Sequence, residues 1–458
     1  MAWMKREENR INNEILTGVI WQQLLLFFLP LLGGTFFQLL YNTVDTIVVG
    51  RFVGKEALSA VGGPAATLIN VFVGLFVGIT SGETVVISQF YGAGKFREVK
   101  EAVYTGIVLA VAGGLILTAA VGSAARPMLE AMDTPADTLE LSITYLRIYA
   151  LGMIGNMIYN MGASILRGAG DSRRPFLYLA AGTVTNVVLD LVMVVVMHWG
   201  VAGVAIATIV SQYVSAVCVL VCLLREDGAI HLDRKPHRID PEFLFRILRI
   251  GIPAAVQSLM YSFSNVLIQT AIDGFGTDTV AGWTVYSKMD LVYWMVVNSF
   301  GLATTTVVGQ NFGAGRYRRV RSAVRQAMAI LCTFCVVIAG LLLLLRYPFC
   351  HVFTNDPAVI RNAISMLEFM APIYITYIAI EIMADSLRGC GDALMPTIIT
   401  VLGVCGIRVV WLYTVLPRFR TMRTVMMSYP ISWVISSAAF VAYYEYFVRK
   451  HHIAAGKN

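Results

Sequence analysis

Long segments without charged residues constrain this chain more than any other feature. No charged side chain occurs between Ile15 and Val44, and the windows Val201–Leu224 and Thr424–Tyr444 are also uncharged. About 20 consecutive apolar residues cross the hydrocarbon core of a bilayer as one helix. Only helices or closed barrels satisfy their backbone hydrogen bonds there, and the sequence lacks the alternating pattern of barrel strands. The chain is therefore predicted to be an all-α membrane protein.

Composition excludes the other broad classes. Charged residues make up 14% of the chain and hydrophobic residues 57%, whereas soluble domains carry roughly 25% charged residues. Seven cysteines, an odd number, do not suggest a disulfide framework. The net charge of +7 comes from short basic clusters between apolar segments. Such clusters set membrane topology, so nucleic acid is not expected as a partner.

Twelve apolar windows are long enough to span a membrane. Several of them contain isolated charges, but none has enough charge to be excluded as a span. The predicted spans are Ile15–Gly50, Ala57–Phe90, Val103–Val121, Leu141–Leu166, Pro175–Val201, Val201–Leu224, Ile250–Ile272, Thr279–Val308, Ala327–Leu345, Asn362–Ala384, Ala393–Leu416 and Thr424–Tyr444.

The distribution of basic residues predicts the orientation of these spans. Most of the 35 Lys and Arg residues fall in alternate loops, on the side that also holds the N-terminus. Positive loops stay in the cytoplasm, so both termini are expected to be cytoplasmic, in a plasma membrane that we expect to be a bacterial inner membrane. Arg418, Arg420 and Arg423 fall on the opposite side, and the rule does not explain them.

An internal repeat predicts the architecture. Gln89–Arg97 (QFYGAGKFR) returns as Gln310–Arg318 (QNFGAGRYR), and Leu166–Asp171 (LRGAGD) returns as Leu387–Asp392 (LRGCGD), both at a shift of 221 residues. Each copy contains six spans, so two six-helix bundles are expected, related by a pseudo-two-fold axis along the membrane normal. The predicted divisions are a cytoplasmic N-terminus (1–14), an N-lobe (15–224), a cytoplasmic linker (225–243), a C-lobe (244–448) and a cytoplasmic tail (449–458).

The repeated motifs themselves are interpreted as turns between spans. Their glycines permit a sharp turn after a helix, and the aspartate that ends the second motif can cap the next helix.

Two carboxylates within spans are the main candidates for function. Asp45 shares a helical face with Gln38 and Tyr41, and Asp190 shares one with Thr183 and Asn186. A lone Asp at the centre of a span costs roughly 2.5–3.5 kcal/mol. Two such oxygen-rich stripes can hold sodium or a shared proton. A structural network of interhelical hydrogen bonds is the alternative.

Acids in other spans are interpreted as structural. Glu381 and Asp385 lie one turn apart, and Arg408 is expected to neutralise one of them. Glu83 is expected to be solvated, because it lies near the end of its span.

The combined motifs resemble the MATE family of multidrug and toxin extruders. The resemblance covers nearly the whole chain and includes Tyr41–Asp45 (YNTVD) in the first span. It implies two six-helix lobes and export of organic, often cationic compounds, driven by inward movement of protons or sodium. The chain is closer to the DinF-like branch, whose coupling residues correspond to Asp45, Asn186, Asp190 and Thr208.

Three further expectations follow from this resemblance. The positions where the NorM branch carries acids are Tyr261 and Tyr377 here, which implies that the C-lobe cation site of that branch is absent. Pro30, about four turns before Asp45, is expected to act as a gating bend, with a fixed kink as the alternative. A flippase for a lipid-linked sugar is the competing function. It is disfavoured because Arg147 and Arg408 are the only arginines within spans.

Substrates are expected to be lipophilic or cationic small molecules, handled by a monomer. No enzymatic motif, metal site or cofactor is expected. The residues predicted to line the substrate path are Gln38, Tyr41, Asn156, Tyr159, Asn160, Gln257, Tyr261 and Asn265.

Overall fold

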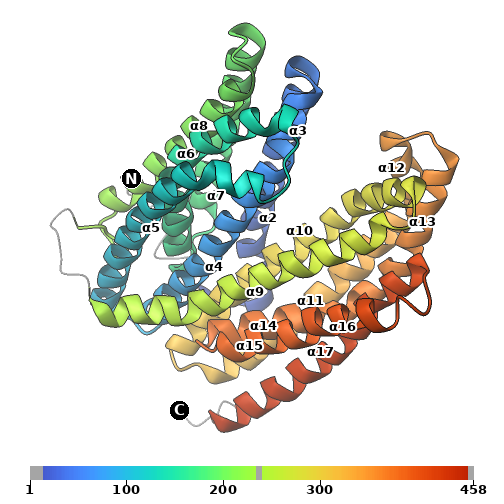
Figure 1. Cartoon of the computed structure of the whole chain (residues 1–458). Coiled ribbons are helices and arrows are strands. Elements are labelled where there is room, and N and C mark those ends of the chain that lie inside the picture. The colour runs from blue at the N-terminus through green and yellow to red at the C-terminus, as the bar shows by residue number, and fades with distance from the viewer. Residues whose placement is uncertain (1–13, 234–239, 452–458) are drawn as a thin grey trace. The chain divides into compact units, whose positions relative to one another are not determined.

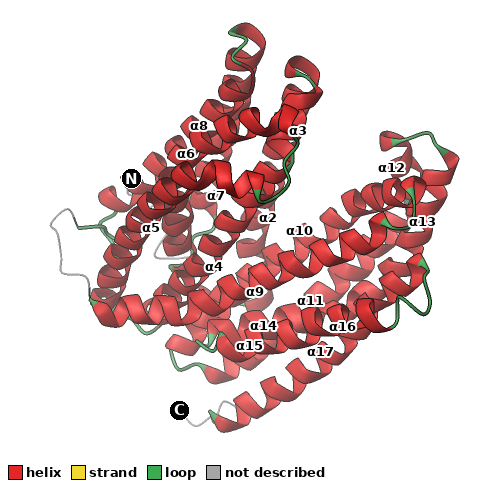
Figure 2. Cartoon of the chain, in the orientation of Figure 1, coloured by secondary structure: helices red, strands yellow, loops and turns green. Residues whose placement is uncertain are grey.

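Helices account for every regular element that the structure, a computed structural model, describes in residues 14–233 and 240–451 (Figure 2). Twelve of the described helical segments are long and apolar enough to cross a membrane. This confirms the predicted all-α class and the number of spans. The described residues form two compact units.

Unit 1 contains the described residues of Leu29–Ala255. Its α6 packs against α4, α5 and α8, and α7 packs against α8. Buried apolar residues such as Val121, Leu146 and Val204 form its core. The elements of the first half are α2 (Ile20–Val48), η1 (Val49–Val53), α3 (Lys55–Gly62), α4 (Pro64–Gly92), α5 (Phe96–Glu130), α6 (Ala136–Gly168), α7 (Arg173–Asp190), η2 (Leu191–Val196) and α8 (Gly200–Arg225), as labelled in Figure 1.

Unit 2 contains residues 14–28 and the described residues from Val256 onward. Its α10 packs against α11, α13 and α14, and α14 packs against α17. The elements of the second half are α9 (Pro241–Asp273), α10 (Thr277–Gly313), α11 (Tyr317–Leu344), α12 (Arg346–Phe353), α13 (Pro357–Met370), η3 (Ala371–Tyr377), α14 (Ile378–Gly389), α15 (Leu394–Ile399), η4 (Thr400–Gly406), α16 (Ile407–Thr414) and α17 (Met422–Lys450).

The first helix of each half is shared between the units, and the division falls close to a proline. In α2 the boundary lies between Phe28 and Leu29, next to Pro30. In α9 it lies between Ala255 and Val256, next to Pro253. A proline inside a helix removes one backbone hydrogen bond and clashes with the preceding turn. Each helix is thus weakened near the point where it passes from one unit to the other.

The start of α2 belongs to unit 2 and the start of α9 belongs to unit 1, and each packs against other helices of that unit. In unit 2 the ring of Phe28 lies 5.3 Å from that of Phe300, and Arg319 Nη2 donates to the carbonyl of Gly18 at 2.8 Å. In unit 1 the ring of Phe243 lies 5.5 Å from that of Phe90.

The turns of the two sequence repeats have matching backbone geometry. Gly94 and Gly315 have φ values of +70° and +69°, and Gly170 and Gly391 have values of +99° and +93°. A φ in this range ends a helix and strongly favours glycine. After the second motif, the Oδ1 of Asp171 accepts from the backbone N–H of Arg173 at 2.9 Å. The interpretation of these motifs as turns with a capping aspartate is confirmed.

One contact between two helices also occurs in both halves, a few residues before the repeated motifs. Thr84 Oγ1 donates to the carbonyl of Ser164 at 3.3 Å, and Thr305 Oγ1, 221 residues later, donates to that of Asp385 at 3.2 Å. The neighbouring glycines Gly168 and Gly389 let the helices approach closely. A Cβ on either would come within 2.9 Å of the threonine carbonyl oxygen.

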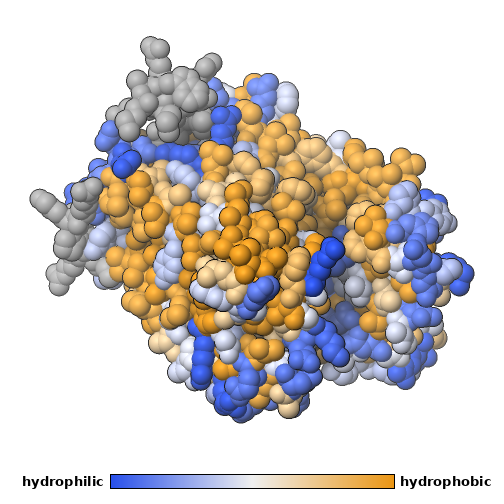
Figure 3. Space-filling view, turned by 90° about the horizontal axis from the view of Figure 1, so that it is seen from above, coloured by the Kyte–Doolittle hydropathy of each residue, from blue (hydrophilic) through white to orange (hydrophobic). Residues whose placement is uncertain are grey.

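Large apolar side chains remain exposed on many helices, as expected for a surface that faces lipid. Ile116, Leu344 and Val352 have 68%, 73% and 76% of their surface exposed. The face shown in Figure 3 carries broad apolar areas, with hydrophilic residues gathered toward its margins. Soluble monomers rarely expose large contiguous apolar patches.

Candidate functional site

Three helices of unit 1 bring the predicted cation-coupling residues together. Asp45 comes from α2, Asn186 and Asp190 from α7, and Thr208 from α8. Asp45 has 7% of its surface exposed and the other three have 0%. Asp45 interacts electrostatically with Asp190 and Asn186, and Thr208 interacts with Tyr41 on the first helix.

The polar groups of this site are not satisfied by neighbouring side chains. Five of its side-chain atoms have no hydrogen-bond partner among the described residues: both carboxyl oxygens of Asp190, both amide atoms of Asn186 and the Oδ1 of Asp45. Thr208 Oγ1 donates to the carbonyl of Val204 on its own helix at 2.9 Å. Buried polar groups in native proteins are almost always hydrogen-bonded. These buried atoms of the cluster therefore have unused hydrogen-bonding capacity.

Tyrosines border the acid pair, and no basic side chain that the structure describes does so. Tyr41, Tyr145 and Tyr149 interact with the Asp45 carboxyl, and Gln212 Nε2 donates to the Tyr149 hydroxyl at 3.1 Å. The arginine of this region, Arg147 on α6, is exposed. Two acids without a fixed counter-ion are costly together unless a proton or metal cation neutralises one of them.

The predicted substrate-lining residues of unit 1 lie in two groups. Gln38 is exposed and Tyr41 is half-buried, both on α2. On α6, Asn160 Nδ2 donates to the side-chain oxygen of Asn156 at 3.0 Å, and the Tyr159 hydroxyl donates to the carbonyl of Pro175 at 3.0 Å. Pro30 is half-buried inside the continuous helix α2.

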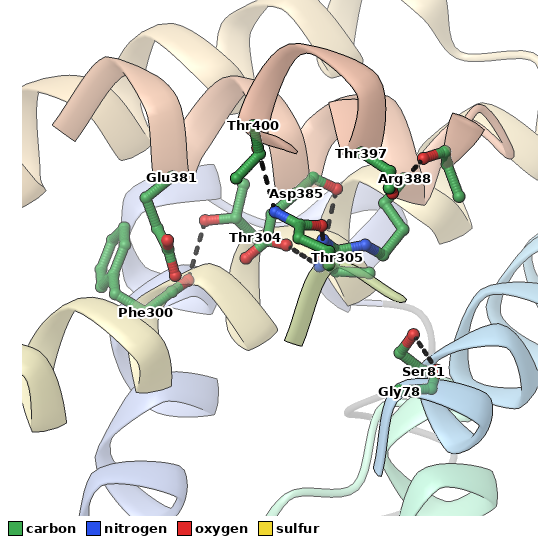
Figure 4. A network of polar contacts seen from close by, with 12 residues as sticks. Gly78, Ser81, Phe300, Thr304, Thr305, Glu381, Asp385, Arg388, Thr397 and Thr400 are labelled. Carbon is green, nitrogen blue, oxygen red and sulfur yellow. Dashed lines mark hydrogen bonds and ion pairs between the residues drawn. The ribbon is translucent and has the colours of Figure 1, made fainter. Parts of the chain in front are cut away.

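Unit 2 contains a satisfied ion network around α14 (Figure 4). Arg388 forms an ion pair with Asp385, three residues before it, and its Nη2 donates to Gln257 Oε1 at 3.0 Å. Gln257 Nε2 in turn donates to Thr400 Oγ1 at 3.1 Å. The acids Glu381 and Asp385 face Gly301 on α10, where a Cβ would come within 2.7 Å of both.

The prediction that Arg408 neutralises one of these acids was wrong. Arg408 is buried and is directed elsewhere: its Nε donates to Ser432 Oγ at 3.2 Å, and its Cζ lies 4.1 Å from the ring centroid of Tyr429. Arg388 takes its place because a spacing of three residues on one helix puts it beside Asp385.

The remaining predicted lining residues of unit 2 occupy different environments. The hydroxyls of Tyr261 and Tyr377 lie 3.1 Å apart, and Tyr377 also donates to Glu381 Oε2 at 3.2 Å. Gln257 belongs to the ion network above, and Asn265 is exposed on α9.

An aromatic cluster in unit 2 was missed by the sequence analysis. At its centre, Asp290 accepts hydrogen bonds from the Tyr374 hydroxyl at 2.6 Å and from Trp294 Nε1 at 2.7 Å. The Tyr286–Asp290–Trp294 spacing of four residues could have revealed one face of this cluster. Its rings belong to Trp283, Tyr286, Tyr293, Trp294, Tyr374, Tyr377, Tyr429 and Trp433.

The environment of Glu83 also differs from the expectation. Its side chain is 0% exposed, in contrast to the predicted solvation. Glu83 lies nine residues before the last residue of α4, Gly92. The nine residues correspond to about 13 Å along the helix axis, so the side chain starts too deep in the bundle to reach solvent.

Twelve spans, two repeated halves and buried acids without a fixed counter-ion are features of secondary transporters. A family model described as MatE matches residues 30–192 and 253–414, one stretch in each half of the repeat. The chain therefore belongs to the MatE family of transporters.

Similar proteins carry multidrug-resistance names. The chain is 27% identical over 448 residues to "Probable multidrug resistance protein YoeA" of Bacillus subtilis, with 95% of both chains covered. It is also 27% identical to "Probable multidrug resistance protein NorM" of Thermotoga maritima, with 84% of this chain and 83% of that one covered.

Solved structures support the fold. An outward-facing multidrug resistance MATE family transporter of the MOP superfamily matches with a TM-score of 0.89 and 23% identity, covering 97% of this chain and 98% of that one. A MOP superfamily transporter from Pyrococcus furiosus matches with a TM-score of 0.87 and 23% identity, covering 96% of this chain and 98% of that one.

Proposed function

We propose that this MatE-family protein is a multidrug exporter that antiports organic, often cationic compounds against H⁺ or Na⁺ by alternating access. The observation that carries the proposal is the acid pair Asp45–Asp190, which is buried without a basic partner among the described residues. Relatives with multidrug-resistance names that cover most of the chain support the substrate class.

Asp45 and Asp190 are the coupling acids in this proposal. A cation that enters the pair removes the repulsion between two carboxylates and satisfies their vacant oxygens. Its departure restores the repulsion, so α2 and α7 prefer different packing in the loaded and empty states. A cation that binds one packing better than the other shifts the equilibrium between them.

The pattern of acids favours the DinF-like branch. All four residues of that branch are present in unit 1, whereas the positions of the NorM-branch acids are the hydrogen-bonded pair Tyr261 and Tyr377. A hydroxyl pair that is already satisfied offers no charge to a coupling cation. Relatives carry names from more than one branch, so this assignment is part of the proposal.

Substrate recognition follows from the same unit. Exposed Gln38 and half-buried Tyr41 and Asn156 offer neutral hydrogen-bonding groups. Aromatic and methionine side chains can bind varied lipophilic cations through dispersion and cation–π contacts. A lipid-linked sugar flippase would require several arginines for pyrophosphate, and Arg408 is already occupied by Tyr429 and Ser432.

The protein is further proposed to act as a monomer in the plasma membrane with both termini in the cytoplasm. The loops rich in Lys and Arg support this orientation.

Ethidium efflux with pH and sodium gradients imposed separately tests the proposal. We expect one of the two gradients to drive efflux and its collapse by an ionophore to stop it. Efflux that continues without either gradient would contradict antiport. The choice between the two gradients identifies the coupling ion.

A further inference from the structure

Glu83 is a buried acid that the proposed transport mechanism does not use. Its side chain is 0% exposed, and neither carboxyl oxygen has a hydrogen-bond partner among the described residues. The Asp45 site involves α2, α7 and α8, whereas Glu83 comes from α4. The acids of the two sites therefore come from different helices of unit 1.

One helix lies against the carboxyl group itself, and two others lie against the residues on either side of Glu83. On α5, a Cβ at Gly106 would lie 2.8 Å from the Glu83 Cδ, so the acid fills the space of the missing side chain. On α9, the carbonyl oxygen of Ile247 would lie 2.2 Å from a Cβ at Gly82. On α6, the carbonyl of Ser164 accepts from Thr84 at 3.3 Å. Residues 82–84 are thus closed in by neighbouring helices.

The hydroxyl groups nearby do not stabilise a charge on Glu83. Thr80 donates to the carbonyl of Val77 at 2.9 Å, and Thr105 on α5 donates to that of Glu101 at 2.8 Å. Ser81 donates to the carbonyl of Gly78 at 2.6 Å, as Figure 4 shows. Each of these donors is directed to the backbone of its own helix.

Charged groups that the structure describes on the packed helices do not pair with Glu83 either. Arg97 pairs with Glu101 at 3.2 Å, Arg167 donates to Ser164 Oγ at 2.9 Å, and Arg246 pairs with Glu242 at 2.6 Å. The titratable groups on these helices are Arg97, Glu98, Lys100, Glu101, Tyr104, Arg126 and Glu130 on α5, Asp137, Glu140, Tyr145, Arg147, Tyr149, Tyr159 and Arg167 on α6, and Glu242, Arg246, Arg249, Tyr261 and Asp273 on α9.

We propose that Glu83 is a second proton-binding site of unit 1, separate from Asp45 and Asp190. A buried carboxylate without a partner costs far more than the neutral acid, so Glu83 keeps its proton while α4 packs against α5 and α9. Release of the proton requires water to reach Glu83 between α4 and the helices packed against it. Hard metal cations need several oxygen ligands, and the described residues contain no cluster of three or more His, Cys, Asp or Glu side chains that could hold a metal ion.

The equivalent positions in the second half of the repeat carry no acid. At the shift of 221 residues, Glu83 and Gly106 correspond to Thr304 and Ala327. Thr304 is also 0% exposed, and it donates to the carbonyl of Phe300 at 2.9 Å. A smaller polar residue and a larger apolar one occupy the two positions in unit 2, so packing there does not require an ionisable group.

The first test compares thermal unfolding across pH for the purified full chain, Glu83→Gln and the control Glu101→Gln. Glutamine has the shape of the protonated acid and cannot lose a proton. We expect equal melting temperatures for Glu83→Gln and wild type at low pH. As pH rises, the wild type should lose stability because ionised Glu83 is disfavoured in the folded state, and Glu83→Gln should lose less. Glu101→Gln should follow the wild type. Parallel curves for Glu83→Gln and wild type would overturn the proposal.

Infrared difference spectroscopy gives a second readout that is independent of transport. We expect a carbonyl-stretch band of a protonated acid without hydrogen bonds, present in Asp45→Asn/Asp190→Asn and absent in Glu83→Gln. If Glu83→Gln yields no folded protein, Glu83→Asp should shift the band. A band unchanged by substitution of Glu83 overturns the proposal, whatever efflux measurements say of the coupling site.

Discussion

At the scale of single residues, the buried acids of this protein differ in whether a basic side chain lies beside them. The guanidinium group of Arg388 lies beside Asp385. No basic side chain of the described residues lies beside Asp45 or Asp190. Removing one partner of a buried pair leaves an uncompensated charge. An acid without a partner can instead gain and lose a cation. Substitutions of these two kinds of acid should therefore have different consequences.

Asp45→Asn is expected to abolish gradient-driven ethidium efflux while yield and melting temperature stay near those of the wild type. The amide keeps the shape of the side chain and removes its ability to bind a cation. Efflux from inverted vesicles and thermal unfolding of the purified protein measure the two effects.

Asp190→Asn should cause a large but incomplete loss of efflux, because the remaining carboxyl of the pair still titrates. Asp137→Asn, at an exposed position of α6, is the control and should be fully active. Wild-type efflux in Asp45→Asn would remove the acid pair from the mechanism.

Arg388→Met should destabilise the protein through Asp385, by about 3–5 kcal/mol for a buried pair that loses one partner. The Arg388→Met/Asp385→Leu double variant should recover much of that loss, because it removes both charges. Chemical unfolding of the purified variants measures the difference. A Glu381→Gln variant that is well folded but inactive would place coupling in unit 2 instead.

At the scale of helices, α2 and α9 each carry a proline beside the unit boundary, and Pro30 is predicted to act as a gating bend. Pro30→Ala restores a backbone donor and should stiffen α2. We expect slower efflux with substrate affinity within a few-fold of the wild type. Binding and turnover have to be measured on the same preparation. Pro253→Ala provides the matched comparison in α9, and unchanged efflux in Pro30→Ala would mean that the kink is static.

The two repeated helix crossings should respond alike to added volume. Gly168→Ala and Gly389→Ala each place a Cβ within 2.9 Å of a threonine carbonyl oxygen, so both should lower the melting temperature. Gly122→Ala on α5, where the Cβ would meet no atom within 4 Å, should be neutral or stabilising by about 0.5–1 kcal/mol. Equal behaviour of all three variants would show that the close approach is not limiting.

Sequence reasoning was most successful where the determinant is local. Apolar length predicted the twelve spans, and the glycines of the repeats predicted the turns, because both depend on a few consecutive residues. The Arg388–Asp385 pair was also local, yet the more distant Arg408 was preferred. The burial of Glu83 depends on Gly106 of another helix, and the register between two helices is not encoded in either one alone.

At the scale of the whole molecule, the repeat explains the fold but not the division into units. The two sequence halves have matching turns, yet each compact unit includes the start of the other half's first helix. In unit 2, the start of α2 supplies Phe28 against Phe300 and the Gly18 carbonyl for Arg319. The second half therefore lacks part of its own core when it is made alone.

Separate expression of the halves tests this dependence. A fragment that begins at Asp240 should aggregate, because Phe300 and its neighbours lose the apolar cover of α2, and burying one such aromatic side chain contributes about 1.5–3 kcal/mol. Co-expression with a fragment that ends at Asp233 should restore a monodisperse, stable complex, measured by size-exclusion chromatography and thermal unfolding. Phe28→Ala in the first fragment should weaken the complex, whereas exposed Leu29→Ala should not. A second half that is monodisperse by itself, with the melting temperature of the complex, would show that the exchanged helix start is not needed for its core.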